Sequence, residues 1–244
     1  SRAMDGEIDA GNHRFAGQEA MIVFDDVFIP HERVFMDGEH EFAAMLVERF
    51  TCYHRRSYVC KTGVGDVLIG AAATVAEFNG VEKASHVRDK LVEMTHLNET
   101  IYSSAIASSH EGKQLPSGVF MHDPMLANVC KHNVTRFPYE ISRLAQDLAG
   151  GLMVTMPSEQ DFAHEVTGPM LSKYLRGRSN VPTEFRQRVL RLIENMTLGR
   201  NAVGYLTESM HGAGSPQAQR IMIQRGMEVE KKKALARALA GIGE

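Results

Sequence analysis

Apolar residues recur along most of this chain at intervals of three and four positions, the period of a helix with one buried face. Phe42, Met45 and Phe50 begin the first such pattern, and Asn79-Gly80 is a typical C-terminal stop. The predicted helices cover about 40–79, 85–110, 124–149, 182–212 and 216–240, with an irregular stretch at 152–181. Helices of this length are typical of an antiparallel bundle.

Two short apolar runs precede the helices. Residues 20–24 and 27–29 are rich in strand-forming residues, with a turn signal at Asp25-Asp26 between them and Pro30 after them. Two or three strands are too few for a stable sheet, so we expect the rest of that sheet upstream, outside this chain. The predicted fold is therefore mainly α, with residues 1–36 ending a β-domain and residues 37–244 forming a helical bundle.

Composition and charge narrow the functional classes. A net charge of −3 without a basic tract argues against a nucleic-acid partner, and no apolar run approaches the roughly 20 residues of a membrane helix. The three cysteines, Cys52, Cys60 and Cys130, are too few for a disulfide framework, which indicates a reducing, cytoplasmic compartment. The chain opens with Ser1 and without a secretory signal, as a segment of a longer protein would.

The densest polar cluster lies within the first predicted helix. At about 100° per residue, Tyr58 lies at roughly +40° and Lys61 at roughly −20° from His54, so the three share one face. They could act as general acids and bases, and the lysine could hold an anionic cofactor. The alternative is a core His and Tyr beside a lysine that reaches water. Cys60, at about 240° from His54, is poorly placed to share a metal ion with it on a regular helix, and is otherwise a buried thiol.

Three further positions carry possible chemistry. Glu19 precedes the first apolar run, where a loop carboxylate is the plain alternative. Glu208 lies in a Gly-rich segment that ends one helix and begins the next, so the site is typical of anion binding and equally of a helical-hairpin turn. Gln146 precedes Gly150 and Gly151, whose bare backbone could approach a pyrophosphate or simply stop a helix.

Four segments resemble known families. Residues 22–30, IVFDDVFIP, resemble the end of the β-domain in the acyl-CoA dehydrogenase superfamily. Residues 54–61, HRRSYVCK, together with 63–70 and 204–220, resemble the 4-hydroxybutyryl-CoA dehydratase/vinylacetyl-CoA isomerase family over nearly the whole chain. The resemblance implies an acyl-CoA dehydrogenase-like C-terminal helical bundle preceded by the last strands of a β-domain.

The resemblance also implies an activity and its cofactors. Members of the family convert 4-hydroxybutyryl-CoA to crotonyl-CoA and isomerise vinylacetyl-CoA by a flavin radical mechanism, with FAD and a 4Fe–4S cluster. The expected partners are an acyl-CoA substrate, further copies in a homotetramer, and the N-terminal half of the same protein.

The family's functional residues carry over onto named positions here. His54 and Cys60 would ligate the cluster, with two more cysteines coming from the N-terminal half. Tyr58 and Lys61 would lie beside cluster and flavin, and Glu19 and Glu208 would be the catalytic carboxylates. Residues Gln146, Gly150 and Gly151 would contact FAD. One departure is clear: the family places the ligand His and Cys seven residues apart, whereas His54 and Cys60 are six apart.

Two other functions remain open at this point. Flavin-dependent aromatic monooxygenases share the fold without the cluster motif, so the chain could belong to an enzyme of that kind. It could also be an inactive fragment that needs its N-terminal half, in which case apolar surface left by the missing sheet would make it associate.

Overall fold

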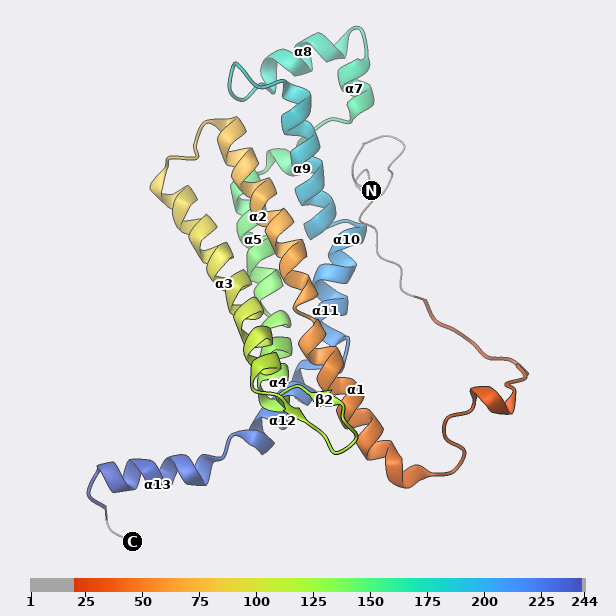
Figure 1. Ribbon diagram of the computed structural model, residues 1–244. Coiled ribbons are helices and arrows are strands. Elements are labelled where there is room, and N and C mark those ends of the chain that lie inside the picture. Colours follow the sequence, from red (N-terminus) through yellow and green to blue (C-terminus); the bar gives the residue numbers. More distant parts are fainter. Residues whose placement is uncertain (1–19, 243–244) are drawn as a thin grey trace.

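The computed structural model describes residues 20–242. Its centre is an elongated bundle of helices that run side by side (Figure 1). The bundle is built on α2 (Cys60–Asn79), α3 (Ser85–His110), α5 (Phe137–Ala149) and α9 (Thr183–Thr197). Helix α2 packs against the other three. Their apolar stripes meet in one core, with Leu68, Val75, Met94, Ile141 and Leu190 among its buried residues.

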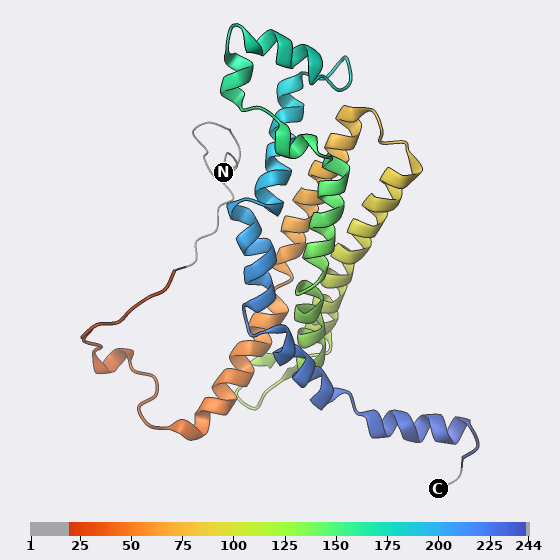
Figure 2. The same ribbon diagram turned by 180° about the vertical axis from the view of Figure 1, so that it is seen from behind.

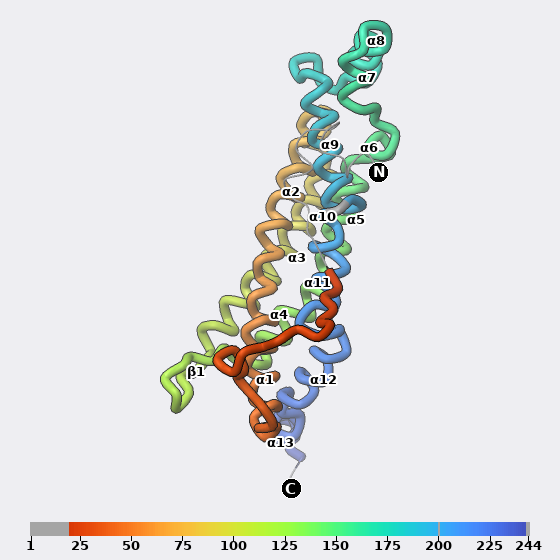
Figure 3. Tube along the Cα trace, turned by 90° about the vertical axis from the view of Figure 1, so that its right-hand side faces the viewer, coloured from red at the N-terminus to blue at the C-terminus, as the bar shows by residue number. Residues whose placement is uncertain are grey.

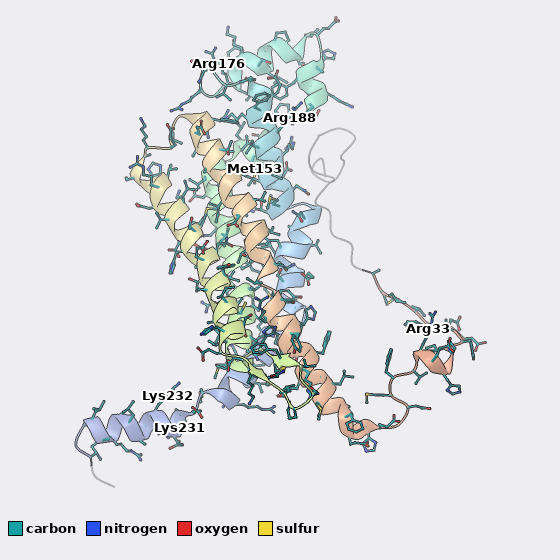
Figure 4. All side chains as sticks on the ribbon, viewed as in Figure 1. Arg33, Met153, Arg176, Arg188, Lys231 and Lys232 are labelled. Carbon is teal, nitrogen blue, oxygen red and sulfur yellow. The ribbon has the colours of Figure 1, made fainter. Side chains whose placement is uncertain are left out.

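Shorter elements extend both ends of this bundle. At one end lie α1 (Ala43–Ser57), α4 (Pro124–Val134), α11 (Glu208–His211) and α12 (Pro216–Gly226), and at the other lie α7 (Glu159–Ala163) and α8 (Thr167–Tyr174) (Figure 3). Between them, α6 (Leu152–Thr155), α10 (Arg200–Ala202) and the π-helix η5 (Val203–Thr207) lie along the bundle. Arg188 of α9, labelled in Figure 4, pairs with Glu159 of α7 at 2.9 Å and ties α7 to the bundle.

The chain ends leave the bundle on opposite sides. Helix α13 (Val229–Leu239) projects away from it, and the segment with the 3₁₀ turns η3 (His31–Arg33) and η4 (His40–Phe42) leads into α1 from the other side (Figure 2). The predicted strands at 20–24 and 27–29 are not formed, and their side chains are exposed. A strand needs a neighbour to bond its backbone, and the part of the chain that the structure describes supplies none there. In the described part of the chain, the β-structure is a hairpin of β1 (Lys113–Gln114) and β2 (Phe120–Met121).

Four of the predicted long helices are broken. The first breaks at Tyr58-Val59, the third between α4 and α5, where Pro138 lies in the first turn of the new helix, the fourth at Leu198-Gly199, and the fifth at Met227-Glu228. Asp123 caps α4 as predicted, because its side chain accepts the Leu126 N–H at 2.7 Å.

Residues His40–Asn79 form a helical stretch long and apolar enough to cross a membrane by length and composition. Its second half, α2, places Leu68, Ala72 and Val75 in the bundle core, as the central helix of a bundle does. Its first half, η4 and α1, exposes Phe42, Leu46 and Phe50. We expect the upstream β-domain to cover that face, so the boundary at residue 36 stays a prediction.

Candidate active site

Glu208 is the centre of a polar cluster inside the bundle. Its Oε1 accepts a hydrogen bond from the Tyr58 hydroxyl at 2.6 Å, and its Oε2 accepts one from Lys61 Nζ at 2.8 Å. Tyr58 is buried, and the Lys61 and Glu208 side chains are 15% and 27% exposed. The structure therefore brings together three of the predicted site residues, from the start of α11 and the junction of α1 with α2.

A tight turn at this junction aligns Tyr58 with Lys61. The N–H groups of Val59, Lys61 and Thr62 bond the carbonyls three residues before them, at 3.2, 3.0 and 2.9 Å. In such a 3₁₀ turn, side chains three apart are eclipsed. Tyr58 and Lys61 therefore point the same way and reach the two oxygens of one carboxylate, which a regular helix would not allow as directly.

The π-helix η5 prepares the other side of the cluster. Its widened turn leaves the Gly204 carbonyl free to accept Lys61 Nζ at 2.8 Å and the Ser209 hydroxyl at 2.7 Å. Tyr205 of the same turn is buried in the core. Single π-helical turns of this kind occur frequently at functional sites, because they re-aim a side chain without ending the helix.

Two buried cations that sequence analysis missed complete the cluster. Lys131 is fully buried and its Nζ donates to the carbonyls of Ser209 and Met210 at 2.6 and 3.1 Å. Arg55 donates to the Ala213 carbonyl at 3.0 Å and also to an α4 side chain. A signal was available for Lys131, since it shares a buried helical face with Ala127, Cys130 and Val134 at positions where an apolar residue is expected.

Electrostatics keep the central carboxyl ionised. Burial acts to raise the pKa of Glu208, but hydrogen bonds from Lys61 and Tyr58 and the charges of Lys61 and Lys131 outweigh it, and the net pKa is lowered. Burial also lowers the pKa of Lys131 to about 8. The arrangement can hold a proton acceptor and a hydroxyl donor side by side, which is the equipment of general acid–base catalysis.

His54 lies next to this cluster. Its ring centroid is 5.3 Å from that of Tyr58, and its Nδ1 is buried without a hydrogen-bond partner in the described part of the chain. It borders a pocket of roughly 450 Å³ together with Ser57 and His122, and His122 directly follows β2 of the hairpin that the sequence did not predict. An imidazole with an unused nitrogen beside a pocket is suited to ligating a metal or accepting a proton.

Cys60 does not lie where a regular helix would place it. Counting 120° for each step of the tight turn, it lies about 40° from His54 rather than about 240°. It eclipses Ser57, and both residues are exposed. Within residues 20–242, no group of three or more metal-ligating side chains is present. On this count the six-residue spacing leaves His54 and Cys60 on one face of the chain, and their role as cluster ligands stays a prediction.

The other predicted positions lie apart from this cluster. Gly150 and Gly151 follow α5, and the Gly150 N–H bonds the Gln146 carbonyl at 2.9 Å. Gly150 has a φ of +70°, and a Cβ at either glycine would meet open space. They adjoin α6, which lies closer to the α7 and α8 end of the bundle than α11 does (Figure 3). Glu19 falls outside the described residues.

Comparisons with known proteins show which family the chain belongs to. The profile of the 4-hydroxyphenylacetate 3-hydroxylase (HpaB) C-terminal family matches residues 43–241. The 4-hydroxybutyryl-CoA dehydratase/vinylacetyl-CoA-Δ-isomerase of Clostridium aminobutyricum is 59% identical over 97% of this chain and 50% of its own length. The oxygen-tolerant archaeal 4-hydroxybutyryl-CoA dehydratase from N. maritimus is 72% identical, with a TM-score of 0.94 over 98% of this chain and 48% of that one.

A more distant relative carries a flavin. The oxygenase component of 4-hydroxyphenylacetate 3-monooxygenase, in complex with FAD and 4-hydroxyphenylacetate, matches with 26% identity and a TM-score of 0.79 over 89% of this chain and 46% of that one. The present chain thus spans about half the length of the relatives it matches.

The fold and the cluster define the class: this is the C-terminal helical half of an acyl-CoA dehydrogenase-like fold. The chain belongs to the 4-hydroxyphenylacetate 3-hydroxylase C-terminal family. Its predicted resemblance to 4-hydroxybutyryl-CoA dehydratase/vinylacetyl-CoA isomerase is confirmed by the identities above.

Proposed function

We propose that this chain, joined to its N-terminal half, dehydrates 4-hydroxybutyryl-CoA to crotonyl-CoA and isomerises vinylacetyl-CoA. The observation that carries the proposal is the Glu208 carboxylate held between Tyr58 and Lys61. Both reactions move protons on the acyl chain, and this cluster pairs a proton acceptor with a hydroxyl donor in a largely buried site. The two relatives named as 4-hydroxybutyryl-CoA dehydratases are 59% and 72% identical, and the name of the first also includes vinylacetyl-CoA isomerase.

The residues present fit the expected cofactors in part. The uncovered backbone at Gly150 and Gly151, beside Gln146, fits contact with FAD, a group found in the HpaB relative. FAD would supply the one-electron redox chemistry that makes an unactivated C–H acidic. His54, with a buried nitrogen unpaired in the described chain, and Cys60, an exposed free thiol, fit two ligand positions of a 4Fe–4S cluster.

Each residue of the polar cluster then has a task. Glu208 accepts a proton at its carboxylate, and the Tyr58 hydroxyl bonded to Oε1 passes it on or returns it. Lys61 fixes the second oxygen, so the carboxylate cannot rotate away from Tyr58. His54, whose ring lies tilted beside that of Tyr58, is a second group able to hold a proton. Glu19 stays a predicted second carboxylate.

Glu208→Gln is expected to lower kcat by about 100-fold or more, because the amide keeps the shape and loses the base. Lys61→Met is expected to move the acid limb of the pH–rate profile to higher pH. Lys61 is one of the groups that lower the pKa of Glu208 from 4.5, so the wild-type carboxylate stays ionised below pH 4.5. Without the lysine, the carboxylate is expected to take up a proton at higher pH. The matched control is Glu140→Gln, an exposed carboxylate paired with Arg143. A Glu208→Gln enzyme as active as this control would remove Glu208 from the mechanism.

Iron content tests the two proposed ligands. In the full-length protein purified without oxygen, His54→Ala and Cys60→Ser are each expected to lose most of the iron while keeping flavin, since a four-ligand cluster tolerates the loss of one ligand poorly. Cys52→Ser is the control, because Cys52 is buried and burial raises the pKa of its thiol to about 11. Unchanged iron in both ligand variants would contradict the assignment.

One alternative is favoured by a specific observation, the match of residues 43–241 to the HpaB family. A flavin-dependent aromatic monooxygenase would contain flavin without iron and would hydroxylate a phenol with oxygen. Iron analysis of the wild-type protein together with a 4-hydroxyphenylacetate assay separates the two functions.

Assembly is a proposal of its own. We expect a cytoplasmic homotetramer of the full-length protein. In it, the upstream β-domain is expected to cover the exposed apolar side chains of η4 and α1, which are Phe42, Leu46 and Phe50. The isolated chain is then expected to self-associate and to lack activity, which size-exclusion chromatography with light scattering would show.

A further inference from the structure

Lys131 is a buried cation that the proposed chemistry leaves unexplained. Its side chain is fully buried, and its hydrogen bonds go to the Ser209 and Met210 carbonyls. Removing an ammonium group from water is unfavourable, and neutral carbonyls compensate it less well than a bonded carboxylate would. A purely structural position would be filled at lower cost by an apolar residue, since α4 buries Ala127, Cys130 and Val134 on the same face.

The contacts of Lys131 lead to both partners of the central hydrogen bond. The two carbonyls belong to the residues directly after Glu208 and therefore anchor the backbone that carries it. Its Nζ also lies 4.6 Å from the centroid of the Tyr58 ring, close enough for a cation–π interaction. One side chain thus touches the Tyr58 ring and the Glu208 segment at once.

We propose that Lys131 is a positioning residue, which holds Tyr58 and the Glu208 segment in register and keeps the Glu208 carboxylate ionised for proton transfer. This inference rests on the proposed function of the Tyr58–Glu208 pair. Nothing in the geometry requires Lys131 to touch the substrate. Its action passes through the two residues that do the proton transfer.

The charges around Lys131 are consistent with that role. Those acting on it are Glu208 of α11, Arg55 of α1, Lys61 of α2 and its own neighbour Cys130. Helices α3 and α12, which also pack against α4, add no charge to this set in the described part of the chain. Burial first, and the two cations further, lower the pKa of Lys131 to about 8, whereas Glu208 acts to raise it. Its positive charge is therefore present at neutral pH and lost in mild alkali.

The test compares Lys131→Met and Lys131→Arg in the full-length enzyme. Lys131→Met is expected to lower kcat for 4-hydroxybutyryl-CoA at least about tenfold with KM unchanged, and to move the acid limb of the profile to higher pH. Lys131→Arg is expected to rescue the acid limb and to extend activity into alkali, because arginine keeps its charge there. Lys173→Met is the control, since Lys173 also lies over a tyrosine ring, at 5.2 Å from Tyr174, but on the exposed α8.

A Lys131→Met profile with wild-type limbs and only a reduced amplitude would overturn the proposal and leave Lys131 a structural residue. If the wild-type protein lacks dehydratase activity, the proposed function fails, and acid unfolding still tests Lys131. The lowered pKa of Glu208 stabilises the fold above pH 4.5, and this stability is lost as pH falls through the folded-state pKa. When Glu208 is present, Lys131→Met is expected to move this loss of stability to higher pH. In a protein that already carries Glu208→Gln, Lys131→Met is expected to cause no such move. An equal shift in both backgrounds would overturn the proposal.

Discussion

Gly212→Ala is expected to lower kcat by about 100-fold or more while the protein stays folded. Gly212 lies against the hydrogen bond between Tyr58 and Glu208. A Cβ there would overlap the Tyr58 hydroxyl and lie 2.8 Å from Glu208 Oε1. Tyr58 is buried and its ring is rigid, so the hydroxyl must leave the carboxylate to make room for a methyl group.

The effect is separable from a general loss of stability. Gly70→Ala, in α2, is the control, because a Cβ there meets nothing within 4 Å. Steady-state kinetics of the full-length Gly212→Ala, Gly70→Ala and Tyr58→Phe proteins give the measurement. Gly212→Ala is expected to match Tyr58→Phe in kcat. Wild-type activity in Gly212→Ala would show that the Tyr58–Glu208 bond is not needed for turnover.

Arg191→Met is expected to lower the free energy of unfolding by about 3 kcal/mol, the largest stability effect foreseen for a single change here. The Arg191 side chain is fully buried on α9 and pairs with Glu194. It also donates to the carbonyls of Met153, Met156 and Pro157, and so ties the segment after α5 to the bundle. Methionine would fill the space but would remove the N–H donors that Arg191 provides to Glu194 and to these carbonyls.

Urea unfolding of the full-length protein, followed by circular dichroism, measures this change. Arg143→Met is the control, since Arg143 forms an ion pair of the same spacing with Glu140 on an exposed face. Exposed pairs contribute little, so the control is expected to unfold almost as the wild type does. Equal midpoints for Arg191→Met and Arg143→Met would show that α6 is held by its apolar contacts alone.

Much of the fold could be predicted because its signals are local. Asp123 before Pro124 predicted the start of α4, and Gly80, with a φ of +75°, ends α2 as predicted. The breaks within the long helices could not be predicted in the same way. The turn at Tyr58-Val59 contains no Gly or Pro, so no residue type in the sequence predicts it. It is stabilised by the hydrogen bonds of Tyr58 and Lys61 to Glu208, which is far away in the sequence.

The sequence indicated which residues belong to the candidate site, but not how these residues are arranged in space. His54, Tyr58, Lys61 and Glu208 were named from motifs, and the last three do converge. Cys60 was placed about 240° from His54 because a regular helix was assumed, and the 3₁₀ turn changes that angle. Lys131 was missed because a lone lysine in an apolar helix is usually a residue that reaches water.

By itself, the sequence determined the helices, their buried faces and the residue types able to carry chemistry, because helical periodicity and capping depend on neighbours within a few positions. Only the tertiary structure decided that Glu208 meets Tyr58 and Lys61 from 150 and 147 residues away. It also decided that a π-helical turn and two buried cations hold Glu208 there. The physical reason is that such contacts depend on how whole helices pack, and on where a helix tightens or widens to satisfy a buried charge.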